Sequence, residues 1–114
     1  MGLEISTRKL GDVTILDLQG EVIAGAASDA LSNSLQELVA QGARKILLNL
    51  GNVAKLDTTG ISSIVRGFVS LQREGGKLAL LNVRGRVRMV LDMTRLLNVF
   101  PNFENEGVAL ASLR

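Results

Sequence analysis

Four consecutive residues carry groups that could do chemistry: Asp57, Thr58, Thr59 and Gly60. An aspartate and two threonines supply side-chain oxygens that can accept the free N–H groups at the start of a helix. The same N–H groups, together with the helix dipole, favour an added phosphate at that point. The four residues therefore fit a plain helix cap or a phosphorylation site, and residue types alone leave both interpretations open.

A helix must follow these residues to position them. Apolar side chains recur there with the period of one helix face, at Ile61, Ile64, Val65, Phe68 and Leu71. Polar side chains mostly lie off that face, at Ser62, Ser63, Arg66, Gln72 and Arg73. Gly75 and Gly76 predict the end of the helix, because glycine adopts the left-handed conformation common at helix C-termini. We therefore expect the two threonines at or near the surface, at the positive end of the helix dipole.

The composition excludes several classes of protein. With 114 residues, of which 46% are apolar and 21% charged, the chain predicts one compact domain over residues 1–114. It has no cysteine, which excludes a disulfide scaffold and a thiolate nucleophile. It also has no histidine, the commonest metal ligand and general base. We therefore expect no metal, no cofactor and no catalytic residue.

Charge and hydropathy point away from nucleic acids and membranes. A net charge of +2 is too small to indicate nucleic-acid binding, and no Trp or Tyr is present to stack on bases. No apolar run is long enough for a membrane span, and the N-terminus lacks the pattern of a signal peptide. These features predict a cytoplasmic protein without membrane insertion.

The first part of the chain predicts a hairpin and a helix. Alternating side chains at 3–8 and an apolar run at 13–18 read as antiparallel strands joined at Gly11-Asp12, the second ending at Gly20-Glu21. Ser28 is a plausible N-cap for an amphipathic helix that Gly42 ends.

The rest of the chain predicts further strands and helices. Residues 46–50 and 77–81 are apolar runs typical of buried strands, and 51–55 read as a loop. The remaining expected elements are a helix over 83–91, a short edge strand at Val99-Phe100 before Pro101, and a helix over 104–112. The order predicts an α/β fold: a mixed sheet of four or five strands, an N-terminal antiparallel hairpin and about four packed helices.

Five stretches occur in order over almost the whole chain: Gly20-Glu21, residues 46–50, Leu56-Asp57-Thr58-Thr59-Gly60-Ile61, residues 75–78 and Leu91-Asp92-Met93-Thr94. Together they resemble a STAS domain of the bacterial anti-sigma factor antagonist family. Members of that family carry Asp-Ser-Ser-Gly or Asp-Ser-Thr-Gly at the start of the second helix. The resemblance implies a STAS-like fold over residues 1–114.

What the resemblance implies is a partner switch. In the family, the unphosphorylated antagonist binds an anti-sigma factor that is also a serine/threonine kinase, and thereby frees the sigma factor. The kinase phosphorylates the first hydroxyl residue after the aspartate, which would be Thr58 here, and a phosphatase resets it. Asp57, Thr59, Gly60 and Ser62 would belong to the partner-binding surface, and Gly60 would let the partner approach the backbone closely.

The chain departs from the family pattern at three positions. Thr58 stands where these antagonists usually have Ser. Ile23 stands where many members have Asp after Gly-Glu-x. Arg95 replaces a Gly that is common after the Asp-x-Ser/Thr element.

Other functions remain open beside the switch. A STAS domain can also be docked permanently in a larger assembly, such as a stressosome scaffold or a lipid-transport ATPase complex, or can sense nucleotides. An enzyme is disfavoured, because Asp17, Glu21 and Asp57 have no histidine to work with. Arg84, Arg86 and Arg88 could bind an acidic partner or phosphate, and a solvated helix face is the simpler interpretation.

Overall fold

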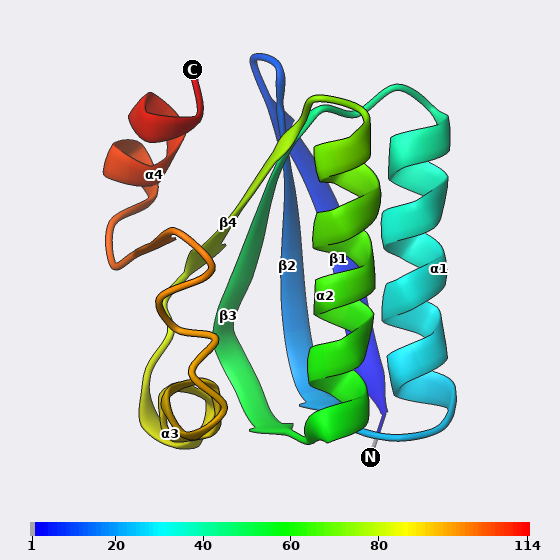
Figure 1. Ribbon diagram of the computed structural model, residues 1–114, viewed down its shortest axis with the longest axis vertical. Coiled ribbons are helices and arrows are strands. Elements are labelled where there is room, and N and C mark those ends of the chain that lie inside the picture. The colour runs from blue at the N-terminus through cyan, green and yellow to red at the C-terminus, as the bar shows by residue number, and fades with distance from the viewer. Residues whose placement is uncertain (1) are drawn as a thin grey trace.

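A five-stranded mixed sheet organises the chain (Figure 1). The computed structural model describes residues 2–114. The elements are β1 (Leu3–Leu10), β2 (Val13–Val22), α1 (Ala26–Ala40), β3 (Lys45–Leu56), α2 (Thr58–Arg73), β4 (Lys77–Leu81), α3 (Gly85–Met93), β5 (Asn102–Phe103) and α4 (Glu106–Leu113). The strands lie side by side in sequence order; β1 and β2 are antiparallel, and every later neighbour is parallel. The predicted α/β fold with its N-terminal hairpin is confirmed.

Helices pack on both faces of the sheet. On one face, α1, α2 and α3 bury alternate residues of the strands, among them Leu16, Ile46 and Leu48. On the other face, α4 covers a smaller cluster that includes Ile15 and Leu47. The central strands are therefore buried on both sides, which explains why residues 46–50 form a continuous apolar run. None of the helices within residues 2–114 has the length and apolar character needed to cross a membrane.

Two strands run further than the sequence predicted. β2 does not end at Gly20-Glu21 but continues to Val22, and residues 51–55 are strand rather than loop. The two extensions pair with each other in parallel, up to Val22 beside Leu56. The ladder is irregular next to Gly20, whose φ of 119° lies in the region that favours glycine. Hydrogen bonding between strands thus outweighs the polar composition of this segment.

The edge strand and the start of α1 also differ from expectation. The edge strand is Asn102–Phe103 and not Val99-Phe100, since Phe100 turns inward and meets Phe68 edge-to-face, with ring centroids 5.1 Å apart. Such aromatic pairs favour burial of both rings over extension of the strand. At α1 the N-cap is Gly25 rather than Ser28, and Ser28 is fully buried.

The end of α3 explains the departure at Arg95. The amide of Leu96 donates to the Leu91 carbonyl at 2.9 Å, and the amide of Arg95 donates to the Asp92 carbonyl at 3.0 Å. This is a Schellman motif, whose first residue beyond the helix must be left-handed. Arg95 indeed has a φ of 62°, a conformation in which glycine is free of the strain imposed by a Cβ atom.

Replacing Arg95 with Gly should therefore stabilise the fold, by about 1 kcal/mol, because it removes a Cβ from a left-handed residue. The matched control is Arg88→Gly, which places glycine at an exposed position inside α3 and should destabilise by about 1 kcal/mol. Urea titrations of the three proteins measure both changes. Equal destabilisation by the two substitutions would show that the left-handed turn carries no strain.

Candidate functional site

The candidate site lies at the edge of the sheet where the parallel strands end. β2 leads there into α1, and β3 leads into α2, so the amino ends of the two helices lie at the same end of the molecule (Figure 1). Carboxyl ends of neighbouring parallel strands are the usual place for a site in α/β folds. All five residues of the predicted site, Asp57, Thr58, Thr59, Gly60 and Ser62, belong to the junction of β3 and α2 or to the first turns of α2.

Asp57 is the N-cap of α2 and also joins two loops. One carboxylate oxygen, Oδ1, accepts the Gly60 amide at 2.8 Å, and the other, Oδ2, accepts the Ala24 amide at 2.8 Å. Its own amide donates to the Val22 carbonyl at 3.3 Å. The amides of Gly60 and Ala24 hold the pKa of the Asp57 carboxyl below its usual range, because they stabilise the ionised form. Asp57 therefore caps α2 and fixes the loop before α1.

The hydroxyl side chains of the predicted site lie at the surface of the protein. Thr58 is the first residue of α2 and is exposed, as are Thr59 and Ser62. The Ser62 hydroxyl donates to the Thr58 carbonyl at 3.0 Å, along the helix. The predicted placement of Thr58 at the start of this helix and at the surface is confirmed. A kinase could reach its hydroxyl without unfolding any element.

Gly60 has a different role from the one expected. The residue is buried, and a Cβ atom at this position would collide with the Val22 carbonyl oxygen and approach the Leu56 side chain. Its lack of a side chain thus lets α2 start directly against the end of β2. The close approach that glycine permits here is made by the chain itself.

The sequence did not reveal a buried pair of serines behind the motif. Ser28 of α1 and Ser63 of α2 are both fully buried, with their hydroxyl oxygens 2.6 Å apart. The Ser28 hydroxyl oxygen also lies 3.0 Å from the Thr59 carbonyl oxygen, and the Ser63 hydroxyl oxygen lies 3.0 Å from the Ser28 carbonyl oxygen. Because each hydroxyl has one proton, one serine donates to the other hydroxyl while its partner donates to a carbonyl. These bonds tie the first turns of the two helices together, directly beneath the exposed threonines.

One signal in the sequence could have located this contact. Gly60, Ser63 and Gly67 follow one another at i, i+3 and i+7, so they line one face of α2 with small residues. A Cβ at Gly67 would collide with Leu35 of α1. The stripe of small residues allows α1 and α2 to approach closely, which a pattern of apolar residues alone does not predict.

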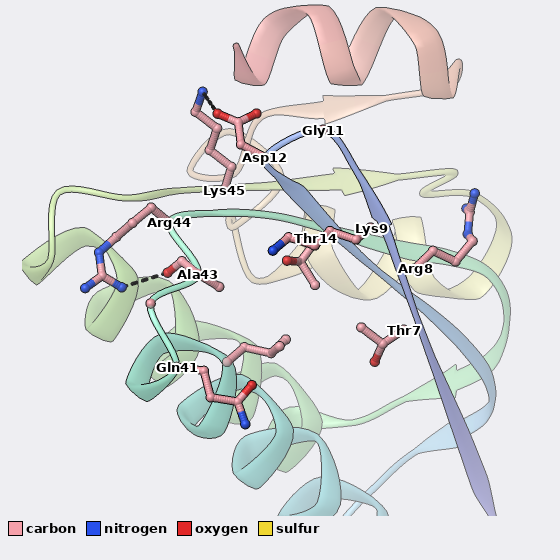
Figure 2. Close-up of a pocket in the computed structure, with 12 residues that line it drawn as sticks. Thr7, Arg8, Lys9, Gly11, Asp12, Thr14, Gln41, Ala43, Arg44 and Lys45 are labelled. Atoms are coloured by element: carbon pink, nitrogen blue, oxygen red, sulfur yellow. Dashed lines mark hydrogen bonds and ion pairs between the residues drawn. The ribbon is translucent and has the colours of Figure 1, made fainter.

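A cleft on the molecule lies elsewhere. A cleft of about 640 Å³ opens between the β1–β2 turn and the end of α1, at the opposite edge of the sheet (Figure 2). Its lining includes Arg44 and Lys45, but both are already engaged: Lys45 pairs with Asp12 at 2.7 Å, and Arg44 donates to the Ala43 carbonyl at 2.8 Å. Of the four cations that line the cleft, Arg8, Arg44 and Lys45 are engaged inside the chain, so among the described residues only Lys9 has no such bond.

The acidic residues do not form a reaction site together. Asp17 is bound by Arg8 at 2.6 Å and by Asn49 at 2.8 Å, whereas Asp57 is bound by backbone amides at the sheet edge. Within residues 2–114, no three acidic side chains gather closely enough to hold a metal ion. What the site offers is an exposed hydroxyl on a rigid surface.

Comparison with known proteins agrees with this geometry. The model of the STAS domain family matches residues 4–109. The anti-sigma F factor antagonist of Paenibacillus polymyxa is 29% identical over 114 residues, covering 99% of this chain and 97% of the relative.

Solved structures share the fold. An anti-sigma factor antagonist from Mycobacterium paratuberculosis superimposes with a TM-score of 0.87 and 22% identity, covering 99% of this chain and 95% of the other. The Bacillus cell fate determinant SpoIIAA in its phosphorylated form gives a TM-score of 0.76 and 19% identity, covering 97% and 100%. The expected STAS-like fold is confirmed.

The buried serine pair should contribute to stability as a unit. Ser28→Ala and Ser63→Ala should each destabilise by about 1 kcal/mol, because each removes the bond between the two hydroxyls, while the remaining hydroxyl still has a backbone carbonyl to donate to. The double variant should lose less than the sum, because the bond that the two hydroxyls share is lost only once. Urea unfolding measures all three, with the exposed Ser62→Ala as control, which should change stability by less than about 0.5 kcal/mol. Strictly additive losses would mean that the two hydroxyls do not act together.

The Asp57 clamp should weaken in acid. Because folding lowers the pKa of Asp57, the carboxylate contributes fully above about pH 4, its unfolded value, and loses its contribution as the pH falls through the lowered folded pKa. Asp57→Asn can still accept from Gly60 but not also from Ala24, so it should cost about 1 kcal/mol at neutral pH.

The measurement is urea unfolding of both proteins between pH 7 and pH 2. The difference between wild type and Asp57→Asn should shrink below pH 4, whereas Asp29→Asn, which alters an exposed acid in the first turn of α1, should stay close to wild type at neutral pH. A difference that is constant over the whole range would contradict the charged clamp.

Proposed function

The chain belongs to the STAS domain family, and on this basis we propose that it is an anti-sigma factor antagonist switched by phosphorylation of Thr58. The unmodified form binds an anti-sigma factor that is also a serine/threonine kinase, and so releases the sigma factor. The kinase then modifies Thr58, the complex dissociates, and a phosphatase restores the binding form. The observation that carries this proposal is an exposed threonine at the first position of α2, beside the Asp57 cap.

The surface around Thr58 suits a partner that docks without rearrangement. Thr58, Thr59 and Ser62 present exposed hydroxyl groups on the first turns of α2. The Asp57 bonds and the buried serine pair hold these turns in place, and a preorganised surface loses little conformational freedom on binding. Asp57 and Gly60 contribute to the surface chiefly by setting its shape.

The electrostatics of the first turn explain how a phosphate would act. A phosphate on Thr58 adds about −1.5 to −2 charges next to the ionised Asp57. The Gly60 and Ala24 amides, which could have neutralised it, already donate to Asp57. Inside a contact surface that excludes water, this uncompensated charge would oppose docking.

The protein would act by binding and not by catalysis. A kinase supplies its own base, ATP and metal ions, so Asp57 has no catalytic task and the chain needs no cofactor. Since the proposed partners work on transcription, we place the protein in the cytoplasm, as one STAS domain over residues 1–114.

The relatives support the same proposal. The Paenibacillus polymyxa protein is named as an anti-sigma F factor antagonist, and it is covered over 97% of its length. The Bacillus protein SpoIIAA, which shares the fold, has been solved in a phosphorylated and an unphosphorylated form. A protein with this fold therefore exists in the two states that the switch requires.

The switch is tested with the purified ATP-binding anti-sigma factor encoded nearest to the gene of this chain. Mass spectrometry after incubation with ATP should place one phosphate on Thr58, and phosphorylation should weaken binding at least about tenfold, equal to 1.4 kcal/mol. Thr58→Asp should imitate part of the loss. Thr58→Ala should bind like wild type and resist modification, and Ser62→Ala should still be phosphorylated.

Two results would contradict parts of this proposal. A phosphate on Thr59, Ser62 or Ser63 would make the assignment of the acceptor wrong. If no hydroxyl is modified and Thr58→Asp binds as tightly as wild type, a permanently docked STAS subunit replaces the switch.

A further inference from the structure

The outer face of α3 exposes two methionines. Met89 and Met93 are 60% and 77% exposed, more than any other large apolar side chain described as exposed on this chain. They lie four residues apart and so share one side of the helix. Single exposed apolar residues are common on protein surfaces, but two long flexible side chains side by side mark a possible contact.

The segment that contains α3 is rich in positive charge. Residues 84–95 contain four arginines and one aspartate, a formal charge of +3, whereas the whole chain has only +2. Arg84, Arg86, Arg88 and Arg95 are exposed. The ion pairs found within residues 2–114 involve Arg8, Arg44 and Lys45 as cations, and none of them includes an arginine of residues 84–95.

Helical spacing brings the methionines and arginines of α3 onto its outer side. At about 100° per residue, Arg86 falls next to Met93 on one side of the two methionines. On the other side Asp92 falls next to Met89, and Arg88 lies beyond Asp92. The opposite side of α3 is buried through Val87 and Leu91. The outer face is thus an apolar strip with Arg86 on one side and with Asp92, followed by Arg88, on the other.

The helix that carries this face lies at the same end of the molecule as the start of α2 (Figure 1). α3 packs against β3, and Val87 and Leu91 share one core cluster with Leu56, the residue immediately before Asp57. One partner could therefore cover both the start of α2 and the outer face of α3.

We propose that the outer face of α3 is a second part of the partner-binding surface, and that it takes an acidic segment of the partner that also carries apolar side chains. The proposal rests on the proposed function and deepens it, because it states the chemistry of the partner that this chain selects. Methionine and arginine are both enriched at protein interfaces, and opposite charges speed and orient association.

A protein partner fits better than a nucleic acid or a membrane. The face has no aromatic residue to stack on bases. α3 has nine residues and offers two exposed methionines, which is little for a helix that must bury an apolar face in lipid. A protein segment can bury both methionines and pair with the arginines at once.

The test measures binding of the same purified anti-sigma factor at low and at high salt. Arg86→Glu/Arg88→Glu should weaken binding at least about tenfold at low salt and remove most of its salt dependence. Met89→Ser/Met93→Ser should weaken binding about tenfold with the salt dependence unchanged.

The matched control is Lys9→Glu/Lys77→Glu. Both lysines are exposed and lie at the opposite edge of the sheet. Their substitution changes the net charge by the same amount as Arg86→Glu/Arg88→Glu. At about 0.1 M salt this variant should bind within about twofold of wild type, because charges beyond a Debye length of about 10 Å are then largely screened. Circular dichroism and urea titration check that every variant is folded.

The outcomes separate this proposal from the switch. If both α3 variants bind the anti-sigma factor like wild type while Thr58→Asp binds it more weakly, the proposal for the α3 surface is wrong and the switch stands. If the α3 variants bind more weakly and Thr58→Asp binds like wild type, the proposal for the α3 surface stands and the switch is wrong. An equal loss of affinity in the lysine control would mean that the effect comes from net charge alone, and it would overturn the proposal.

Two further probes test the other possible occupants. Vesicles of phosphatidylserine and phosphatidylcholine and a DNA duplex should not bind wild type at physiological salt. Binding to either one that disappears in Arg86→Glu/Arg88→Glu would assign the face to that ligand and overturn the proposal. If no candidate anti-sigma factor binds wild type, the proposed function fails and the α3 surface fails with it.

Discussion

The carboxylate of Asp57 is the interaction on which the functional edge of this molecule depends. Its two oxygens accept one amide from the first turn of α2 and one from the loop before α1, each at 2.8 Å. Parallel strands alone would leave the loops at their carboxyl ends free to move. Because one ionised group binds both segments, the start of α2 and the β2–α1 loop form one surface. The low pKa of this group keeps it ionised at neutral pH, so the clamp stays closed under ordinary conditions.

Close packing beneath the surface reinforces the clamp. Gly60 lets α2 begin against the Val22 carbonyl, and Gly67 lets Leu35 of α1 approach the helix backbone. Ser28 and Ser63 fill the space between the two helices with hydrogen-bonded hydroxyls. The polar group of each serine is satisfied inside the protein, which avoids the cost of a buried unpaired hydroxyl. The exposed threonines therefore lie above a region that is both tightly packed and hydrogen-bonded. In the proposed switch, a phosphate would act on this surface through its charge.

Much of this arrangement could be predicted from the sequence, and the misses have a common cause. The period of Ile61, Ile64 and Leu71 predicted α2 and its buried face, and the apolar runs predicted the central strands. The extension of β3 to Leu56 was missed because pairing with β2, rather than side-chain hydropathy, holds those residues in the sheet. Ser63 was placed off the buried face because it is polar, although its partner on α1 satisfies it inside. Local pattern thus identifies elements and their apolar faces, whereas contacts between distant segments decide where a small or polar residue is buried.

The central claim is that a partner covers the edge formed by the starts of α1 and α2 together with α3. Amide resonances of the isotope-labelled protein, recorded by NMR while the unlabelled anti-sigma factor is added, test it most directly. We expect residues 22–25, 57–63 and 84–93 to shift or broaden, and residues 9–12, 42–45 and 74–77 at the opposite edge to stay unchanged. Perturbation of the opposite edge, with the Asp57 and Thr58 signals unaffected, would contradict the account.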